Sequence, residues 1–439
     1  MRSLIFTSVF VVALVVGLAV SFYQIDDEEG VEVWDCTFDE EDVCVETVIQ
    51  EHRYCQEEGD IPRQEYCRDT DTDIEEVTVF TDPSNYIKAP MTEEEYDIDS
   101  LDIGENAAWD ADFLDDGSFF YTEMNGTLVR QEGDETVESA SLNQTEKFGN
   151  TGLLGVAADP DFEDNRYVYL YYYTGEWRDV EPDPTEDIDP IYNRVSRFTF
   201  DDGELEDEKV LIDGIPGSSG HSGGRIDIGP DNRLYVTTGD SEYLKTDHDE
   251  LHQDIQDRDF LGGKVLRTEL DGSVPEENPF DQSYVYAEGF RNPQGISFEP
   301  ETGQPFISEH GPWRYDRAID VEKGQNYGWP AERCGYEYQE HVELEDETAE
   351  TFYCFNEWTV APSGTTFVDD PEHEWYGNFF ITGLRGSVLY SIDVETGEGE
   401  VFYIRKDEEL DNRLRNVEFH EGSLYLFGDG FGAGKLTPS

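Results

Sequence analysis

A hairpin pattern repeats six times along the chain, and this repeat limits the possible folds more than any other feature. Each unit has an apolar strand, a turn rich in Asp, Pro, Asn or Gly, and a second aromatic or β-branched strand. The units span residues 113–121, 156–171, 226–236, 296–308, 367–381 and 417–426. A hairpin cannot bury both faces alone, so the hairpins must pack against one another, and radial packing gives a propeller. The sequence therefore predicts an all-β protein, a six-bladed β-propeller; a β-sandwich would account for the strands but not for their recurrence.

The chain ahead of the repeats differs in composition, with an apolar run followed by an acidic segment. An apolar run from Leu4 to Tyr23 follows Met1 and Arg2, and acidic residues end it. Signal peptides have apolar regions of roughly 7–15 residues, whereas a membrane span needs about 20. We therefore interpret residues 1–24 as a signal peptide or an N-terminal membrane anchor, with both options open. In either case we expect an exported protein, extracellular or at the cell surface.

Six cysteines fit an exported protein in an oxidising place. Residues 25–76 are acidic and carry four of them, so we predict a small disulfide-containing segment or stalk ahead of a propeller domain at 77–439. These four can pair in three ways, and no C-x-x-C motif points to zinc. They are Cys36, Cys44, Cys55 and Cys67. The later pair, Cys334 and Cys354, predicts a disulfide that contributes roughly 3 kcal/mol by chain entropy.

The charge balance is extreme, with 103 Asp and Glu against 29 Lys and Arg, a formal net charge of −74. Such repulsion opposes compaction at ordinary salt, but at molar salt the Debye length is about 3 Å and the repulsion is screened. The acidic residues are spread along the chain, which indicates adaptation to a very salty medium. The absence of a basic patch excludes nucleic acid as a partner.

One candidate for chemistry is a histidine among glycines, in residues 220–225, just ahead of the third repeat. The glycines permit close backbone approach, and the imidazole of His221 suits proton abstraction near neutral pH. Asp240, at the end of the paired strand, could hold the ring in one tautomer. The plainer interpretation is a surface-loop histidine, and the residues alone favour neither strongly.

Three further stretches carry candidate ligands. Arg291 and Asn292 precede a proline, and a guanidinium fork suits carboxylates. Residues 309–312, with Asp316 and Tyr327 nearby, combine a Gly-Pro turn with carboxylate oxygens, which suits calcium better than a soft metal. Arg413 and Arg415 lie two residues apart and share one strand face, although a salt-bridged surface strand would look the same.

From about Asn106 to the end, these motifs together resemble the soluble quinoprotein glucose and aldose-sugar dehydrogenases. The stretches that carry the resemblance occur in the family's order. They are residues 152–162, 221–240, 291–295, 309–312, 326–330, 361–364 and 413–416. The resemblance implies an oxidoreductase that uses pyrroloquinoline quinone (PQQ) and Ca²⁺ to oxidise the anomeric hydroxyl of an aldose to a lactone, passing electrons to an external acceptor.

The resemblance also implies residue roles. His221 would be the base and Asp240 its orienting partner. The cofactor contacts would be Asn150, Arg291, Asn292, Arg385, Arg413 and Arg415. The metal ligands would be Gly311, Pro312, Asp316 and Tyr327. Two positions depart from the family pattern: Arg317 replaces a glutamate after Asp316, and Phe290 replaces a histidine.

Two other functions fit the same scaffold. A non-catalytic extracellular propeller could bind a glycan or a cell-surface partner, and Arg317 and the cysteine-bearing extension favour it slightly. A propeller hydrolase such as a lactonase would need carboxylates clustered around calcium in the central channel, and no motif points to such a cluster. Nothing in the sequence indicates the oligomeric state.

Overall fold

The chain forms two compact units, Met1–Lys88 and Ala89–Ser439. The computed structural model describes residues 13–15, 18–24, 33–38, 44–49, 98–103, 108–145, 147, 149–174, 192–241, 254–312, 315–334, 336–337, 342, 344, 347–355, 360–385, 387–404, 413–429 and 432–438. Within these residues, no helix has the length and apolar character needed to cross a membrane.

The first unit contains a four-stranded antiparallel sheet in the order β1-β2-β3-β4. Its strands are β1 (Ala13–Val15), β2 (Leu18–Gln24), β3 (Val33–Phe38) and β4 (Cys44–Ile49). Most of the apolar segment 1–24 and of the cysteine segment 25–76 lies outside the described residues. Their roles, the boundary at residue 76 and the pairing of the four early cysteines stay predictions.

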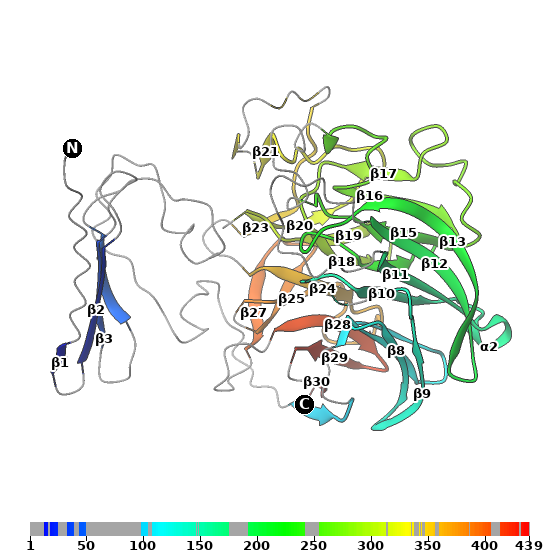
Figure 1. The fold of residues 1–439 in the computed structure, drawn as a ribbon, viewed down its shortest axis with the longest axis horizontal. Helices are drawn as coiled ribbons and strands as arrows, with labels where there is room; N and C mark the ends of the chain where they lie inside the picture. The colour runs from blue at the N-terminus through cyan, green and yellow to red at the C-terminus, as the bar shows by residue number, and fades with distance from the viewer. Residues whose placement is uncertain are drawn as a thin grey trace, which may run out of the picture. The chain divides into compact units, whose positions relative to one another are not determined.

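The second unit is a six-bladed β-propeller, as the repeat predicted: six four-stranded antiparallel sheets follow one another in a ring (Figure 1). The first blade has β6 (Ala108–Phe113), β7 (Phe119–Glu123), β8 (Thr127–Glu132) and β9 (Glu135–Ser141). The second has β10 (Leu153–Ala158), β11 (Tyr167–Thr174), β12 (Tyr192–Asp201) and β13 (Glu204–Pro216), with the short helix α2 (Phe162–Asn165) between β10 and β11. The third has β14 (Ile226–Ile228), β15 (Arg233–Thr237), β16 (Lys264–Glu269) and β17 (Val285–Glu288).

The remaining blades follow the same plan. The fourth has β18 (Pro293–Phe298), β19 (Pro305–Glu309), β20 (Asp316–Asp320) and β23 (Tyr353–Phe355). An insertion between β20 and β23 holds the hairpin β21 (Glu332–Arg333) and β22 (Tyr336–Glu337), and the expected disulfide joins Cys334 to Cys354 there. The fifth blade has β24 (Pro362–Phe367), β25 (Asn378–Gly383), β26 (Val388–Asp393) and β27 (Gly399–Ile404). The sixth has β28 (Leu414–His420), β29 (Ser423–Gly428) and β30 (Gly432–Leu436).

The sixth blade is completed by a strand from the beginning of the unit. β5 (Ile98–Leu101) pairs antiparallel with β30, so that Leu101 lies opposite Ala433 and Ile98 opposite Leu436. The chain ahead of the first blade therefore closes the ring through main-chain hydrogen bonds. This closure gives the sixth blade four strands, as in the other blades.

Each repeat in the sequence is the first hairpin of a blade. The first strands contact one another around the ring, in the order β6, β10, β14, β18, β24, β28 and back to β6, and so they line its centre. Blades bury both faces against their neighbours, which explains why β11 is an unbroken aromatic and aliphatic run rather than an alternating one. From Val168 to Tyr173 every side chain is buried.

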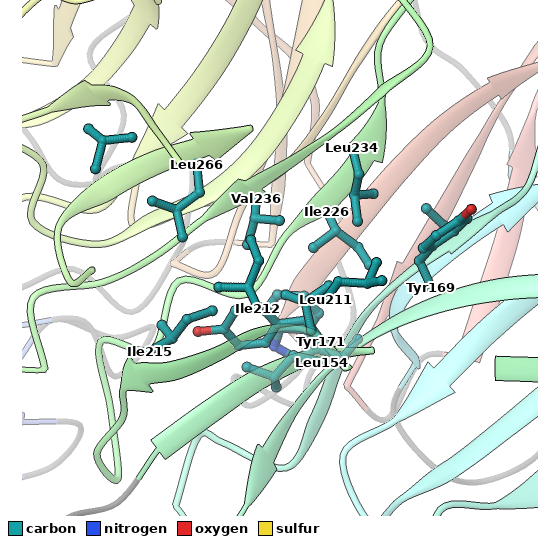
Figure 2. Close-up of a cluster of buried hydrophobic side chains, with 14 of the residues drawn as sticks. Leu154, Tyr169, Tyr171, Leu211, Ile212, Ile215, Ile226, Leu234, Val236 and Leu266 are labelled. Carbon is teal, nitrogen blue, oxygen red and sulfur yellow. The ribbon is translucent and has the colours of Figure 1, made fainter. Parts of the chain in front are cut away.

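Apolar side chains seal the joints between blades. In the cluster shown in Figure 2, side chains from the second blade meet side chains from the third. Leu154, Tyr171 and Ile212 come from the second blade, and Ile226 and Val236 from the third. Burying one such aliphatic side chain contributes about 1.5–3 kcal/mol, so each joint adds substantially to the stability of the ring.

Four carboxyl groups gather at the centre of the ring, on the first strands of three blades. Asp110 and Asp112 belong to β6, Asp227 to β14 and Glu418 to β28. Burial raises the pKa of Asp112 to about 7, with a further rise from the charge of Asp110. Burial, together with the neighbouring carboxylates, raises the pKa values of Asp227 and Glu418 well above their ordinary range. Burial also raises the pKa of Asp110, and the positive charge of Arg225 opposes this rise.

No sequence motif indicated this central cluster. It does not amount to a metal site, because no group of three or more His, Cys, Asp or Glu side chains in the described part of the chain could hold a metal ion.

We expect Asp112→Asn to stabilise the protein at about pH 8 and not at about pH 5. The folded-state pKa of Asp112 is about 7, above its ordinary 3.8, so its contribution to stability is complete at low pH and is lost as pH rises through 7. An amide can still accept the 2.6 Å hydrogen bond from the Ala158 N–H. Thermal melting should show Tm higher than wild type by roughly 2 °C at the higher pH. An equal change at both pH values would contradict this assignment.

Candidate active site

The topology gathers the candidate residues at one end of the propeller. In an antiparallel hairpin, the start of the first strand and the end of the second strand lie at the same end. Asn150, His221, Arg291, Asn292 and Arg413 precede first strands, whereas Asp240, Gly311, Pro312 and Arg385 follow second strands. Residues from five blades therefore come to one face, although they are spread over more than half of the chain.

A hydrogen-bonded series of three side chains lies at this end. Nδ1 of His221 is 2.8 Å from Oδ1 of Asp240, and the indole Nε1–H of Trp329 donates to Oδ2 of Asp240 over 2.9 Å. Asp240 is 1% exposed and the His221 side chain 10%. A carboxylate can only accept, so in the neutral ring Nδ1 carries the proton and Nε2 carries the lone pair.

The backbone around His221 is folded to permit this arrangement. His221 has a φ of +51°, a left-handed conformation that is uncommon for a residue with a side chain. A Cβ on Gly239 would lie 1.8 Å from the carbonyl oxygen of His221, so only glycine allows the two segments to approach. Gly223, one of the glycines that marked this stretch in the sequence, has a similar role, because a Cβ on it would lie 2.7 Å from the carbonyl oxygen of Thr237.

Arg291 and Asn292 are joined to the same segments. The main-chain N–H of Asp240 donates to the Arg291 carbonyl over 2.7 Å, and the Gly223 N–H donates to Oδ1 of Asn292 over 3.1 Å. Nη1 of Arg291 donates to the carbonyl of Gly311 over 3.2 Å. Its guanidinium also lies over the ring of Trp329, 5.6 Å from the centroid. Two of the predicted site residues, Asp240 and Arg291, therefore both contact Trp329.

The other predicted cofactor contacts differ in how they are held. Asn150 is exposed, and its N–H donates to the Ser219 carbonyl over 2.8 Å, close to His221. Arg385 is half-buried and Arg413 is exposed. Arg415 is buried and makes a two-pronged ion pair with Asp429, with its Nη2 2.7 Å from Oδ2. Its charge is therefore already matched within the sixth blade.

The four predicted metal ligands differ in how their oxygen atoms are engaged. Gly311 and Pro312 present main-chain carbonyls on one loop, and these hard oxygen donors fit a calcium ion. Asp316 instead accepts three main-chain N–H groups, from Gly311 at 2.7 Å and from Val360 and Ala361 at 2.8 Å. The Tyr327 hydroxyl donates to the carbonyl of Asp320 over 2.7 Å and accepts the N–H of Glu322. Asp316 and Tyr327 thus both make hydrogen bonds within the protein.

Sequence reasoning missed three residues that shape this end. The indole N–H of Trp329 donates to Asp240, and Glu309 accepts the main-chain N–H of Arg291 through Oε1. Arg225 is buried, four residues after His221. Trp329 and Glu309 stood in stretches that carried the resemblance, but their roles depend on contacts with other segments. Only Arg225, next to the histidine and its glycines, carried a local signal.

Fold and site together define a β-propeller that presents a supported His–Asp pair and several arginines at one end of its ring. The chain belongs to the glucose/sorbosone dehydrogenase family, whose family model matches residues 105–437.

Individual relatives agree with this assignment. Quinoprotein glucose dehydrogenase B of Acinetobacter calcoaceticus is 33% identical over 265 residues, 56% of this chain and about half of that protein, 53%. Aldose sugar dehydrogenase YliI of Escherichia coli is 27% identical over 64% of this chain and 75% of that protein. The solved PQQ-bound aldose sugar dehydrogenase of Streptomyces coelicolor is similar with a TM-score of 0.62 and 25% identity, over 80% of this chain and 99% of that one.

We expect Trp329→Phe to make His221 keep its proton to a higher pH. The variant keeps an aromatic ring but removes the indole donor, so the negative charge of Asp240 is less compensated and stabilises the protonated imidazole more strongly. The shift should be about 0.5–1 pH unit, equivalent to one hydrogen bond of about 1 kcal/mol. NMR titration of histidine-labelled protein without cofactor measures it. Trp375→Phe, in the core of the fifth and sixth blades, is the control, and the same shift in both variants would rule out this role for Trp329.

Proposed function

We propose that the protein is a PQQ-dependent sugar dehydrogenase that oxidises the anomeric hydroxyl of an aldose to the lactone. The observation that carries the proposal is the His221–Asp240–Trp329 series at the arginine-bearing end of the propeller. Membership of the glucose/sorbosone dehydrogenase family supports it, as does the likeness to a PQQ-bound aldose sugar dehydrogenase.

In this mechanism His221 is the general base. Its Nε2 takes the proton of the anomeric hydroxyl while the hydrogen on the same carbon leaves as hydride, so that the carbon–oxygen bond becomes the lactone carbonyl. Asp240 keeps the imidazole in the required tautomer and stabilises the imidazolium that forms. Trp329 in turn fixes Asp240, so the base is oriented before the sugar arrives.

The residues at this end fit a cofactor with several carboxylates. When bound, PQQ supplies a quinone that accepts the hydride. Arg291, Arg385 and Arg413 would hold its carboxylates, and Asn150 and Asn292 would offer amide groups. Arg415 is paired with Asp429, so we assign it the smaller share of binding. Arginines at one face of so acidic a chain would also favour the charge that develops as hydride is transferred.

Calcium would be held by the carbonyls of Gly311 and Pro312, beside Arg291. There it would act as a Lewis acid. In this proposal Asp316 acts on the same loop by accepting the Gly311 N–H, and the Tyr327 hydroxyl donates to the carbonyl of Asp320.

We further propose that this activity belongs to an exported protein. The apolar N-terminal run and the cysteines support an extracellular or surface-bound enzyme, and the acidic composition supports a high-salt medium. There the sugar would be the small-molecule substrate and an external acceptor would reoxidise the cofactor.

We expect His221→Gln to lower kcat by about 100-fold or more while PQQ affinity stays within about threefold of wild type. The reason is that the variant removes the base but none of the arginines. Dye-coupled assays with a panel of aldoses, in high salt with calcium and PQQ, measure the rate. His420→Gln, at a histidine stacked on Phe113, is the matched control. Turnover by His221→Gln at the wild-type rate would eliminate this base.

We expect Arg291→Leu to weaken PQQ binding by about 10-fold or more, because a charge-assisted pair is lost from the site. Titration of the cofactor-free protein, followed by the quinone absorbance, gives the dissociation constant. Arg130→Leu, at an ion pair with Asp116 in the first blade, controls for the general loss of positive charge. If the wild type binds no quinone at all, the protein is better explained as a propeller that binds a glycan or a surface partner.

A further inference from the structure

Arg317 is a cation buried in the fourth blade, and no catalytic role has been given to it. It is the second residue of β20, and only 1% of its side chain is exposed. A guanidinium withdrawn from water in this way is stable only where hydrogen bonds and opposite charge replace its hydration. The hydrogen-bond partners of Arg317 therefore indicate its structural role.

All the partners of Arg317 are oxygen atoms. Nε donates to Oε2 of Glu309 over 2.6 Å, and Glu309 is fully buried. Nη1 donates to the Tyr327 carbonyl over 2.8 Å and lies 3.5 Å from the Thr351 hydroxyl, and Nη2 donates to the Gly289 carbonyl over 3.4 Å. One carboxylate, two main-chain carbonyls and a hydroxyl around one positive charge are the donor set that a hard cation such as calcium takes.

These oxygens belong to the three segments that carry the site. Glu309 comes two residues before Gly311, whose carbonyl accepts from Arg291. Gly289 comes two residues before Arg291, and Tyr327 comes two residues before Trp329. Glu309 also accepts the main-chain N–H of Arg291 through its other oxygen. The cluster therefore lies directly behind the groups that would contact cofactor and support Asp240.

We propose that Arg317 is a built-in cation: its guanidinium takes the structural place of a metal ion and holds the segments of Gly289, Glu309 and Tyr327 together. The framework of the site then needs no metal at this position, because the guanidinium already supplies a positive charge to these oxygens. A covalent cation also cannot be displaced by the ions of a salty medium. The proposal concerns the framework alone and does not rest on the dehydrogenase activity.

The test replaces the guanidinium of Arg317 with a carboxylate, so that the surrounding oxygen atoms become a candidate calcium site. Arg317→Glu leaves two carboxylates, two carbonyls and a hydroxyl around the space that the longer arginine occupied. Melting of the cofactor-free protein is measured with EDTA and with millimolar calcium. In EDTA we expect Arg317→Glu to melt at least about 5 °C below the wild type. Calcium should raise the Tm of the variant by at least about 3 °C more than it raises the Tm of the wild type, in which calcium acts only at Gly311 and Pro312.

Arg267→Glu is the matched control. Arg267 is a buried arginine of the third blade paired with one carboxylate, that of Asp231 at 2.6 Å, but its other contacts are an amide and two tyrosine rings. Charge reversal there should lower Tm without recovery in calcium. Equal recovery in both variants, or a wild type that itself needs calcium as strongly as Arg317→Glu does, would overturn the proposal.

A second comparison keeps the proposal testable if Arg317→Glu does not fold. Arg317→Met leaves Glu309 as an unmatched buried carboxylate, whereas the double variant Glu309→Gln with Arg317→Met removes both charges. We expect the double variant to melt at a higher temperature than the single variant. Equal or lower stability of the double variant would show that Arg317 does not act by neutralising this cluster. Because these measurements use neither quinone nor sugar, they stand apart from any failure of the proposed activity.

Discussion

The arrangement of the propeller depends on one guanidinium at its centre. Arg225, at the entrance to the third blade, donates to the carbonyls of Gln294 in the fourth blade over 2.9 Å and of Arg415 in the sixth over 3.1 Å. It also pairs with Asp110 in the first blade and lies 4.3 Å over the ring of Trp109. A single buried side chain thus connects four blades. Arg225 lies four residues after His221, so the same contacts also anchor the segment that carries this histidine.

The sequence revealed the fold where structure is local. Each blade begins with a hairpin whose two strands and turn lie within a short stretch, so alternation and turn residues expose it directly. Closure by β5 escaped prediction for the opposite reason: Ile98–Leu101 is a four-residue strand whose partner lies more than 300 residues away. Nothing within those four residues distinguishes a closing strand from a linker. The central carboxylates escaped in the same way, because three blades contribute them.

The same distinction holds at the site. His221 and Asp240 are 19 residues apart and belong to the two ends of one hairpin, so their 2.8 Å contact could be predicted from the strand pattern. Trp329 is 89 residues from Asp240 and reaches it from another blade. For Asp316 and Tyr327 the residue types suited a metal, but the sequence could not show the direction of their oxygens. Three main-chain donors satisfy Asp316, and that arrangement appears only after the fifth blade packs on the fourth.

The distribution of charge connects the composition to the site. In a chain of net charge −74, Arg225, Arg291, Arg317 and Arg415 are all buried, and all lie at or directly behind the candidate site. Salt screens exposed charges over about 3 Å at molar concentration but screens buried pairs far less. The repulsion among surface carboxylates therefore depends on the medium, whereas the ion pairs that position the site do not. The salt concentration would then affect the stability of the whole propeller, whereas the buried arginines would fix the geometry of the candidate site at any salt concentration.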